Sequence, residues 1–190
     1  MCALKIPDTF TPTWKAPTRA VAACSTPLLK TYWDSCLADP ATTEKNGVCA
    51  KFKTDNPACG ACAEPVDLSG PIQWQPMRAA YTLNIAGCIY VEQAGTDAGA
   101  SGCGEAYNAA VQCTRAACVT CLTTPSAFSE CEKKASMTGL CASKETAQSA
   151  ACQGYKSAGS PALACFPMSS AEQQMPETWI TRVVAATCGP

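Results

Sequence analysis

The cysteines are the residues of this chain whose type and spacing most directly suggest chemistry. Three of them fall within nine residues, in the stretch CTRAACVTC that runs from Cys113 to Cys121, and a further C-x-x-C pair lies at Cys59 and Cys62. Such pairs occur in structural zinc sites, in thiol redox centres and in disulfide-bonded scaffolds. The rest of the sequence distinguishes between these three possibilities.

A zinc site of four thiolates would combine Cys59 and Cys62 with Cys118 and Cys121. The many other cysteines, and the lack of a glycine-rich turn at the second pair, argue against it. A thioredoxin-like centre would need a strand before its C-x-x-C, whereas Cys118 lies in an alanine-rich run typical of a helix. On a helix Cys118 and Cys121 share a face and Cys113 lies on another, which favours disulfides to different segments. We therefore predict no metal site and no cofactor, with thiolate metal binding as an alternative.

The composition supports a disulfide scaffold. Leu, Ile, Val and Phe supply only 26 of the 190 residues, well below the roughly 20% at which an apolar core is usual. The net charge of -1 is too small to suggest a disordered chain. Disulfides typically contribute about 2–4 kcal/mol each, so they can replace part of a missing core. We predict that the cysteines pair fully: Cys2, Cys24, Cys36, Cys49, Cys59, Cys62, Cys88, Cys103, Cys113, Cys118, Cys121, Cys131, Cys141, Cys152, Cys165 and Cys188.

So many cysteines indicate an oxidising compartment, and we expect a secreted or cell-surface protein. The first residues lack the apolar segment of a signal peptide and contain Pro7, Pro12 and Pro17, so we expect a mature chain whose leader was removed. Whether Met1 is native stays open. Lipidation of Cys2 would leave an odd number of thiols, which favours a disulfide there. No stretch approaches the about 18 apolar residues of a membrane span.

The absence of histidine limits the enzymatic chemistry. It excludes Ser-His-Asp and Cys-His catalysis and sites built on histidine ligands. Carboxylate pairs survive this test, and a carboxylate-dependent hydrolase stays an alternative to the non-catalytic protein that we expect. The basic residues are scattered along the sequence and form no cluster of the kind that binds nucleic acid. The candidate carboxylates, none in a recognisable motif, are Glu64 and Asp67, Glu92 and Asp97, Glu105, and Glu130 and Glu132.

Aromatic residues are the candidates for a binding surface. Tyr32 and Trp33 are adjacent, and Trp74 and Tyr81 lie in a stretch of weakly alternating character. Rings placed in this way can form a flat platform for a sugar or a protein hot spot, although a chain so poor in large apolar residues also needs them in its core. We predict a partner at the cell exterior: a protein, a glycan, or another copy of the chain.

An alternative function is the transport of small apolar ligands. Its structural mark would be a continuous cavity lined by Leu28, Ile89 and Val111. The disulfide connectivity, the identity of the partner and the oligomeric state do not follow from the sequence. For the connectivity alone, 16 cysteines allow about two million pairings.

The elements that must position these residues are mostly short helices. Residues 70–85 differ, because they alternate weakly around Pro76 and predict a small hairpin. Gly139 is typical of a helix end, and the residues after Pro176 fit either a helix or a strand. The helix-start signals are Thr26 with Pro27, Asn56 with Pro57, Asn84, Thr124 with Pro125, and Ser169 with Glu172.

The fold class predicted from these signals is mainly α, a disulfide-cross-linked stack of short helices with a small β-hairpin element. Helices this short are marginal alone, so bonds between neighbours would have to fix their packing. Residues 1–23 are expected to form an extended N-terminal arm, packed through Phe10 and Trp14. Residues 24–190 are expected to form a single helical domain, with the flexible connector at 96–102 as a sub-boundary.

Several cysteine-containing motifs resemble those of cysteine-rich exported proteins of myxobacteria and related soil bacteria. They are C-x9-CGAC at 49–62, LNIAGCI at 83–89 and GASGCGEAYNAAVQCTRAACVTC at 99–121, followed by FSEC and GLCA. The resemblance covers about residues 24–165 and implies secretion with a cleaved signal peptide. It implies no activity and no functional residue.

Overall fold

The computed structural model describes residues 5–6, 10–67, 69–75, 80–93, 102–121, 125–137 and 139–190. The chain forms two compact units, each built from two separate stretches of sequence. Unit 1 comprises Met1–Lys15 and Asp97–Tyr155, and unit 2 comprises Ala16–Thr96 and Lys156–Pro190. The predicted fold class is confirmed, since the described chain is mainly helical with one small antiparallel sheet and several disulfides.

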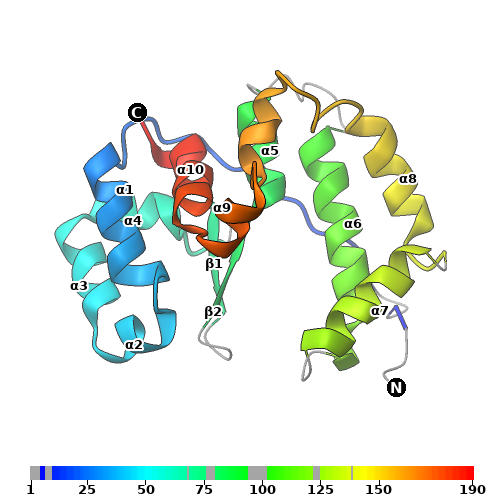
Figure 1. Cartoon of the computed structure of the whole chain (residues 1–190), viewed down its shortest axis with the longest axis horizontal. Helices are drawn as coiled ribbons and strands as arrows, with labels where there is room; N and C mark the ends of the chain where they lie inside the picture. Colours follow the sequence, from blue (N-terminus) through cyan, green and yellow to red (C-terminus); the bar gives the residue numbers. More distant parts are fainter. Residues whose placement is uncertain are drawn as a thin grey trace. The chain divides into compact units, whose positions relative to one another are not determined.

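Unit 1 is a cross-linked set of helices. Its elements are α6 (Cys103–Ala117), a short 3-10 helix (Val119–Cys121), α7 (Pro125–Met137) and α8 (Ala142–Ala151). Helices α6 and α8 lie side by side, and α7 crosses them (Figure 1). Among the residues that the structure describes, the buried apolar core around α6 and α7 consists of cysteines and alanines: Cys113, Ala117, Cys118, Cys121, Cys131, Ala135 and Cys141. Sulfur therefore occupies the places that large aliphatic side chains usually fill.

The N-terminal segment adds the larger side chains that this core lacks. Ile6 and Phe10 pack against it, together with Phe128 of α7. The segment is also hydrogen-bonded to α6, because Asn108 Nδ2 donates to Thr13 O at 2.7 Å. Residues 10–20 form no helix or strand.

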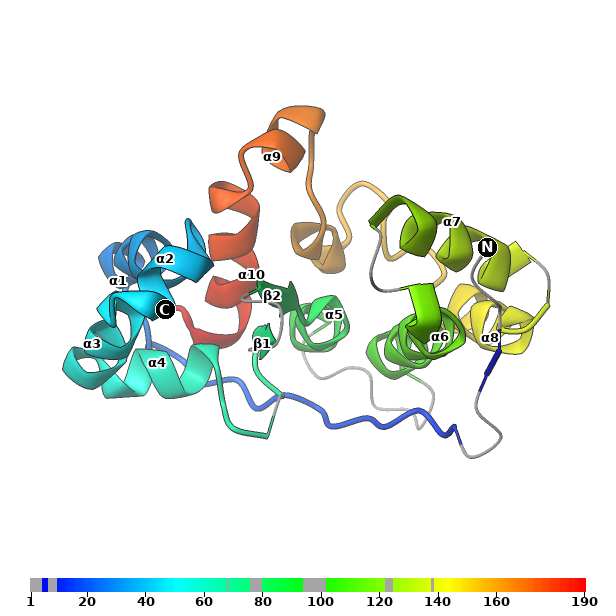
Figure 2. The same ribbon diagram turned by 90° about the horizontal axis from the view of Figure 1, so that it is seen from below.

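Unit 2 contains the remaining elements. Its helices are α1 (Thr26–Tyr32), which continues into a π-helical turn (Trp33–Leu37), α2 (Pro40–Lys45), α3 (Val48–Asp55), α4 (Pro57–Ala63), α5 (Ile85–Glu92), a 3-10 helix (Pro161–Cys165), α9 (Ser170–Gln174) and α10 (Glu177–Cys188). The hairpin is formed by β1 (Ile72–Gln75) and β2 (Ala80–Leu83), paired antiparallel from Ile72 with Leu83 to Gln75 with Ala80. Helix α10 is central, since it packs against α1, α4 and α5 (Figures 1 and 2).

The core of unit 2 mixes sulfur with ordinary apolar side chains. Leu29, Tyr32 and Phe52 from the first helices meet Ile180 and Val184 of α10. The buried cysteines among them are Cys24, Cys36, Cys49, Cys59 and Cys188. The rings of Tyr32 and Phe52 have centroids 5.5 Å apart. The apolar stripe of α10 thus decides the ambiguous stretch after Pro176 in favour of a helix.

Most of the local signals describe the helix ends correctly. Asn56 precedes α4 with Pro57 in the first turn, and Asn84 Oδ1 accepts from Gly87 N at 2.8 Å. Gly139 follows α7 with a φ of 91°, a left-handed conformation that suits glycine. The cap of α1 was predicted one residue too late: Ser25, not Thr26, is its N-cap.

The capping signal at Ser169 is also confirmed. Ser169 Oγ accepts from Glu172 N at 3.2 Å, and Glu172 Oε2 accepts in return from Met168 N at 2.6 Å. The predicted domain boundaries, an arm of residues 1–23 and a domain of 24–190, stay a prediction. Most of the expected sub-boundary at 96–102 lies outside the described residues, as do Pro76 and Thr124.

Candidate functional site

Disulfides are the clearest chemical feature of the described residues, and each of them closes within one unit. Unit 1 contains Cys103–Cys152, Cys113–Cys141 and Cys118–Cys131. Unit 2 contains Cys24–Cys59, Cys36–Cys49, Cys62–Cys188 and Cys88–Cys165. Cys121 is disulfide-bonded as well, whereas Cys2 lies outside the described residues.

The stretch from Cys113 to Cys121 is a set of cross-links. Cys113 bonds to Cys141 at the start of α8, and Cys118 bonds to Cys131 within α7, so these thiols reach different segments as predicted. The other C-x-x-C pair is divided in the same way, since Cys59 and Cys62 bond to different partners. None of these sulfurs is left as a thiolate to bind a metal.

A groove of about 430 Å³ lies within unit 2. Its walls come from the segment before α1, from α4, from the loop that follows α4, and from Thr187 near the end of α10. Most of the lining is small and apolar: Pro17, Ala20, Ala23, Ala58, Ala61, Cys62, Pro65 and Gly70. Ala58 and Ala61 lie three residues apart on α4, so they share the exposed face that borders the groove. Asp67 supplies the charge among the lining residues.

Covalent and backbone bonds hold these walls together. Cys24–Cys59 joins the segment before α1 to α4, and Cys62–Cys188 joins α4 to the end of α10. The segment also pairs with the C-terminal residues: Ala20 N donates to Thr187 O at 2.8 Å and Ala22 N to Gly189 O at 2.7 Å. Ala22 has a φ of 61°, which is costly for a non-glycine residue, so the surrounding bonds must hold it.

The loop of the groove depends on close packing. Gly70 lies against Pro65, and a Cβ atom at Gly70 would collide with the proline ring. Asp67 Oδ1 accepts from both Ser69 N at 3.0 Å and Ser69 Oγ at 2.6 Å, which stabilises the turn that carries the charge. Disulfides, backbone hydrogen bonds and close packing therefore hold the walls of the groove in place.

A second polar cluster in unit 2 is centred on Glu64. Tyr32 Oη donates to Glu64 Oε1 at 2.6 Å, and Lys53 Nζ lies 2.8 Å from Glu64 Oε2. Glu64 also lies near Cys36 and Cys49, with the potential ligand atoms of all three within 4.8 Å of one another. The two sulfurs are bonded to each other, so this cluster is a structural ion pair beside a disulfide.

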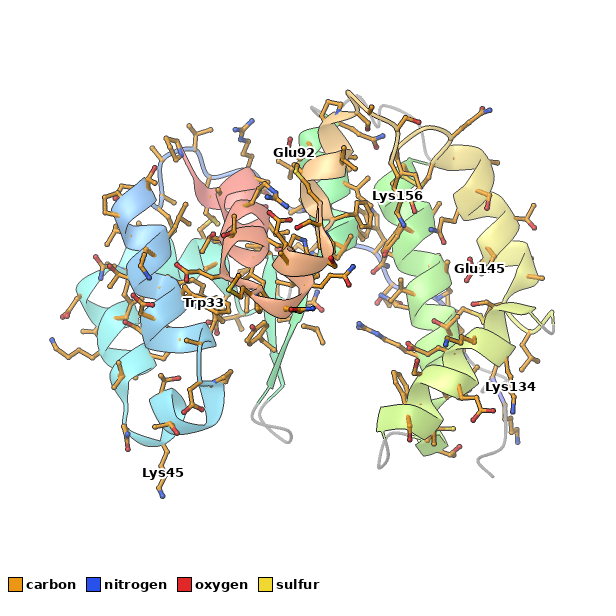
Figure 3. All side chains as sticks on the ribbon, viewed as in Figure 1. Trp33, Lys45, Glu92, Lys134, Glu145 and Lys156 are labelled. Carbon is orange, nitrogen blue, oxygen red and sulfur yellow. A yellow bond between two sulfur atoms is a disulfide. The ribbon has the colours of Figure 1, made fainter. Side chains whose placement is uncertain are left out.

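The structure does not bring the four predicted aromatic residues onto one open surface. The prediction is wrong for Tyr32, which is 0% exposed because its ring is part of the core and its hydroxyl binds Glu64. Trp33, labelled in Figure 3, and Tyr81 are partly buried and pack against the same core. Burial raises the pKa of Tyr81. Trp74 pairs with Tyr81 across the hairpin through its backbone, and its side chain lies outside the described set.

The groove described above is not the cavity expected for an apolar-ligand carrier. Leu28 and Ile89 belong to unit 2 and Val111 belongs to unit 1, and none of them lines the groove. Ile89 is fully buried, and Leu28 packs against the core.

The candidate carboxylates have separate surroundings. Burial raises the pKa of Glu92 against the opposing effect of Arg19, and burial raises the pKa of Glu132 against that of Arg115. Glu130 forms an exposed pair with Lys134 at 3.1 Å. Glu92, Lys134 and Glu145 are labelled in Figure 3 on α5, α7 and α8. Glu105 lies in the first turn of α6, Glu64 and Asp67 are bonded as described above, and Asp97 lies outside the described residues.

Sequence reasoning missed the groove. Most of its lining comes from alanines, prolines and threonines that carry no chemical signature and are far apart in the chain. Two lining residues were identified from the sequence, Cys62 as one of the cysteines and Asp67 as a candidate carboxylate, but nothing in the sequence indicated that they border one groove. In the part of the chain that the structure describes, no helix is both long and apolar enough to cross a membrane. No protein-family model, curated protein or solved structure matches this chain.

Proposed function

We propose that this chain is an exported, disulfide-stabilised, non-catalytic protein that binds a protein partner at the cell exterior. The described cysteines support export, because all of them are in disulfides, which persist in oxidising compartments. The absence of histidine supports a non-catalytic role, as do the bonds that Glu64 and Glu130 form with Tyr32 and Lys134 and not with a second carboxyl group.

The observation that best supports a binding role is the groove of unit 2, whose walls are held by disulfides and backbone hydrogen bonds. Its volume of about 430 Å³ lies within the range of roughly 300–1,000 Å³ that is usual for ligand sites, and its lining is mostly apolar with a few polar groups. Because disulfides and backbone bonds hold its walls, little conformational entropy would be lost when a ligand binds.

The lining favours a segment of a protein over a glycan. A glycan site is expected to offer a flat aromatic ring, and neither Tyr32, Trp33 nor Tyr81 lines the groove. Small side chains such as Ala58 and Ala61 leave room for an extended peptide, and Asp67 favours a Lys or Arg on it by charge complementarity.

A peptide selection tests this proposal. A library of random peptides is displayed against the oxidised protein, and individual binders are then measured against two variants. Ala61→Trp fills the groove, whereas Ala50→Trp places the same bulk on an exposed position of α3 outside it. We expect enriched peptides to carry a basic residue, to lose at least roughly tenfold in affinity with Ala61→Trp, and to bind Ala50→Trp like the parent.

Three results would contradict the proposal. The first is a set of peptides that bind Ala61→Trp as well as the parent. The second is a lipid retained by the purified protein in native mass spectrometry, which would favour the apolar-ligand carrier. The third is concentration-dependent assembly in size-exclusion chromatography that Ala61→Trp does not change, which would favour a self-assembling structural protein.

The kinship with exported cysteine-rich proteins of soil bacteria stays a prediction.

A further inference from the structure

One disulfide of unit 2 differs from the others in its surroundings. Cys62 lines the groove and is partly exposed, whereas every other described cysteine is buried. Its partner Cys188 is 0% exposed. Of the two cysteines of this disulfide, Cys62 borders the groove and Cys188 does not.

From this placement we infer that Cys62–Cys188 is a thiol-exchange site, at which a small aliphatic thiol entering the groove becomes bonded to Cys62. The inference goes beyond the proposed partner binding and does not depend on it. Exchange requires a thiolate to approach one sulfur of the disulfide, so access decides which bond reacts and which sulfur is attacked.

The reaction at this site has a defined direction. The incoming thiolate forms a new S–S bond with Cys62 Sγ, and the Cys62–Cys188 bond breaks with its electron pair on Cys188 Sγ. Cys188 leaves as a thiolate and takes a proton from water. Attack on Cys188 instead is blocked by its burial. The product is a mixed disulfide on Cys62 and a free thiol on Cys188.

The fold of unit 2 is expected to survive this exchange. Cys24–Cys59 still joins the segment before α1 to α4, and Cys24 N still donates to Cys188 O at 2.7 Å. The apolar side of α10, with Ile180 and Val184, stays packed in the core. The lost link is nevertheless the one that spans the longest sequence separation among the described disulfides, 126 residues, so the thermal midpoint should fall.

Brief treatment with 2-mercaptoethanol without denaturant tests the inference. The reaction is quenched with acid, free thiols are alkylated with N-ethylmaleimide, and the modified cysteines are identified by peptide mass spectrometry. We expect mercaptoethanol on Cys62 and maleimide on Cys188 before any other cysteine is modified, with the helical circular dichroism unchanged.

Two groove variants give the control. Ala61→Trp should slow the modification of Cys62 at least roughly tenfold, and Ala50→Trp should leave the rate unchanged. The inference fails if another disulfide reacts first, if the mercaptoethanol is found on Cys188, or if Ala61→Trp reacts as fast as the parent. It also fails if no cysteine reacts until the protein unfolds. A failure of peptide binding alone would leave these rates unaffected, so the two proposals are tested separately.

Discussion

Glu64 shows how much one side chain contributes to the packing of unit 2. Its carboxylate accepts from Tyr32 Oη and forms an ion pair with Lys53, while its side chain is only 13% exposed. A partly buried charge that loses its partner keeps its desolvation cost without the compensating attraction. We therefore expect Glu64→Gln to lower the free energy of unfolding by about 1–3 kcal/mol, measured by denaturant titration of the oxidised protein.

A solvent-exposed ion pair provides the matched control. Lys51 and Asp55 lie one helical turn apart on α3, with 2.8 Å between Lys51 Nζ and Asp55 Oδ2 and side chains that are more than half exposed. Asp55→Asn should cost only about 0.5 kcal/mol, because water screens such pairs. If the two variants lost the same free energy of unfolding, partial burial would not strengthen the interactions of Glu64.

The surroundings of Glu172 predict that the stability of the folded protein depends on pH. Hydrogen bonds from the Arg182 side chain and from Met168 N lower its pKa to about 2. Because the pKa is lower in the folded state, the stabilisation is present above about pH 4.5, the ordinary value, and is lost as the pH falls toward 2. Melting temperatures of the parent and Glu172→Gln should differ most near neutral pH and converge near pH 2.

The corresponding control is Glu130→Gln, which removes an exposed carboxylate paired with Lys134 on α7. Its melting curve should follow that of the parent across the same pH range. A constant difference between the parent and Glu172→Gln down to pH 2 would exclude the ion pair with Arg182 as its cause.

At the level of elements, α8 depends on its two disulfides. No residue within Ala142–Ala151 is buried, so the helix has little apolar surface with which to hold its place. The residues just before and after it are buried cysteines, and both bond to α6: Cys141 to Cys113 and Cys152 to Cys103. The cross-links replace the apolar face that a surface helix normally has.

Removal of one of these bonds should loosen α8 more than α6. We expect Cys103→Ala combined with Cys152→Ala to cost about 2–4 kcal/mol in stability and to speed hydrogen exchange of the α8 amides while the α6 amides stay protected. Ser149→Ala, an exposed substitution on α8, should change neither quantity. Unchanged exchange in α8 would show that packing alone holds this helix.

For the whole molecule, disulfides are expected to supply most of the net stability. Single domains are typically stable by about 5–15 kcal/mol, and each disulfide typically contributes about 2–4 kcal/mol, so the loss of several exceeds the total. Protein prepared under oxidising conditions should take up no maleimide before reduction. After full reduction, the protein should lose its helical circular dichroism at room temperature. It should also show no cooperative melting transition on heating. A melting point unmoved by strong reductant would contradict this role for sulfur.

The local features of the fold could be predicted from the sequence because they depend on neighbouring residues. Asn84 caps α5 and Ser169 caps α9 through hydrogen bonds that span only three residues. The hairpin of residues 72–83 follows from alternation over a short stretch. The shortage of large apolar residues predicted that sulfur would replace them, and the core of cysteine and alanine in unit 1 agrees.

Only the tertiary structure decided which distant residues meet. Cys62 bonds to Cys188 across 126 residues, and no local pattern selects that pairing among the many that the cysteine count allows. The burial of Tyr32 and the groove beside Ala61 were equally hidden, since each depends on helices brought together from both ends of the chain. Composition and short-range hydrogen bonding therefore determined the kind of scaffold, whereas long-range packing determined which cysteines pair and where the groove lies.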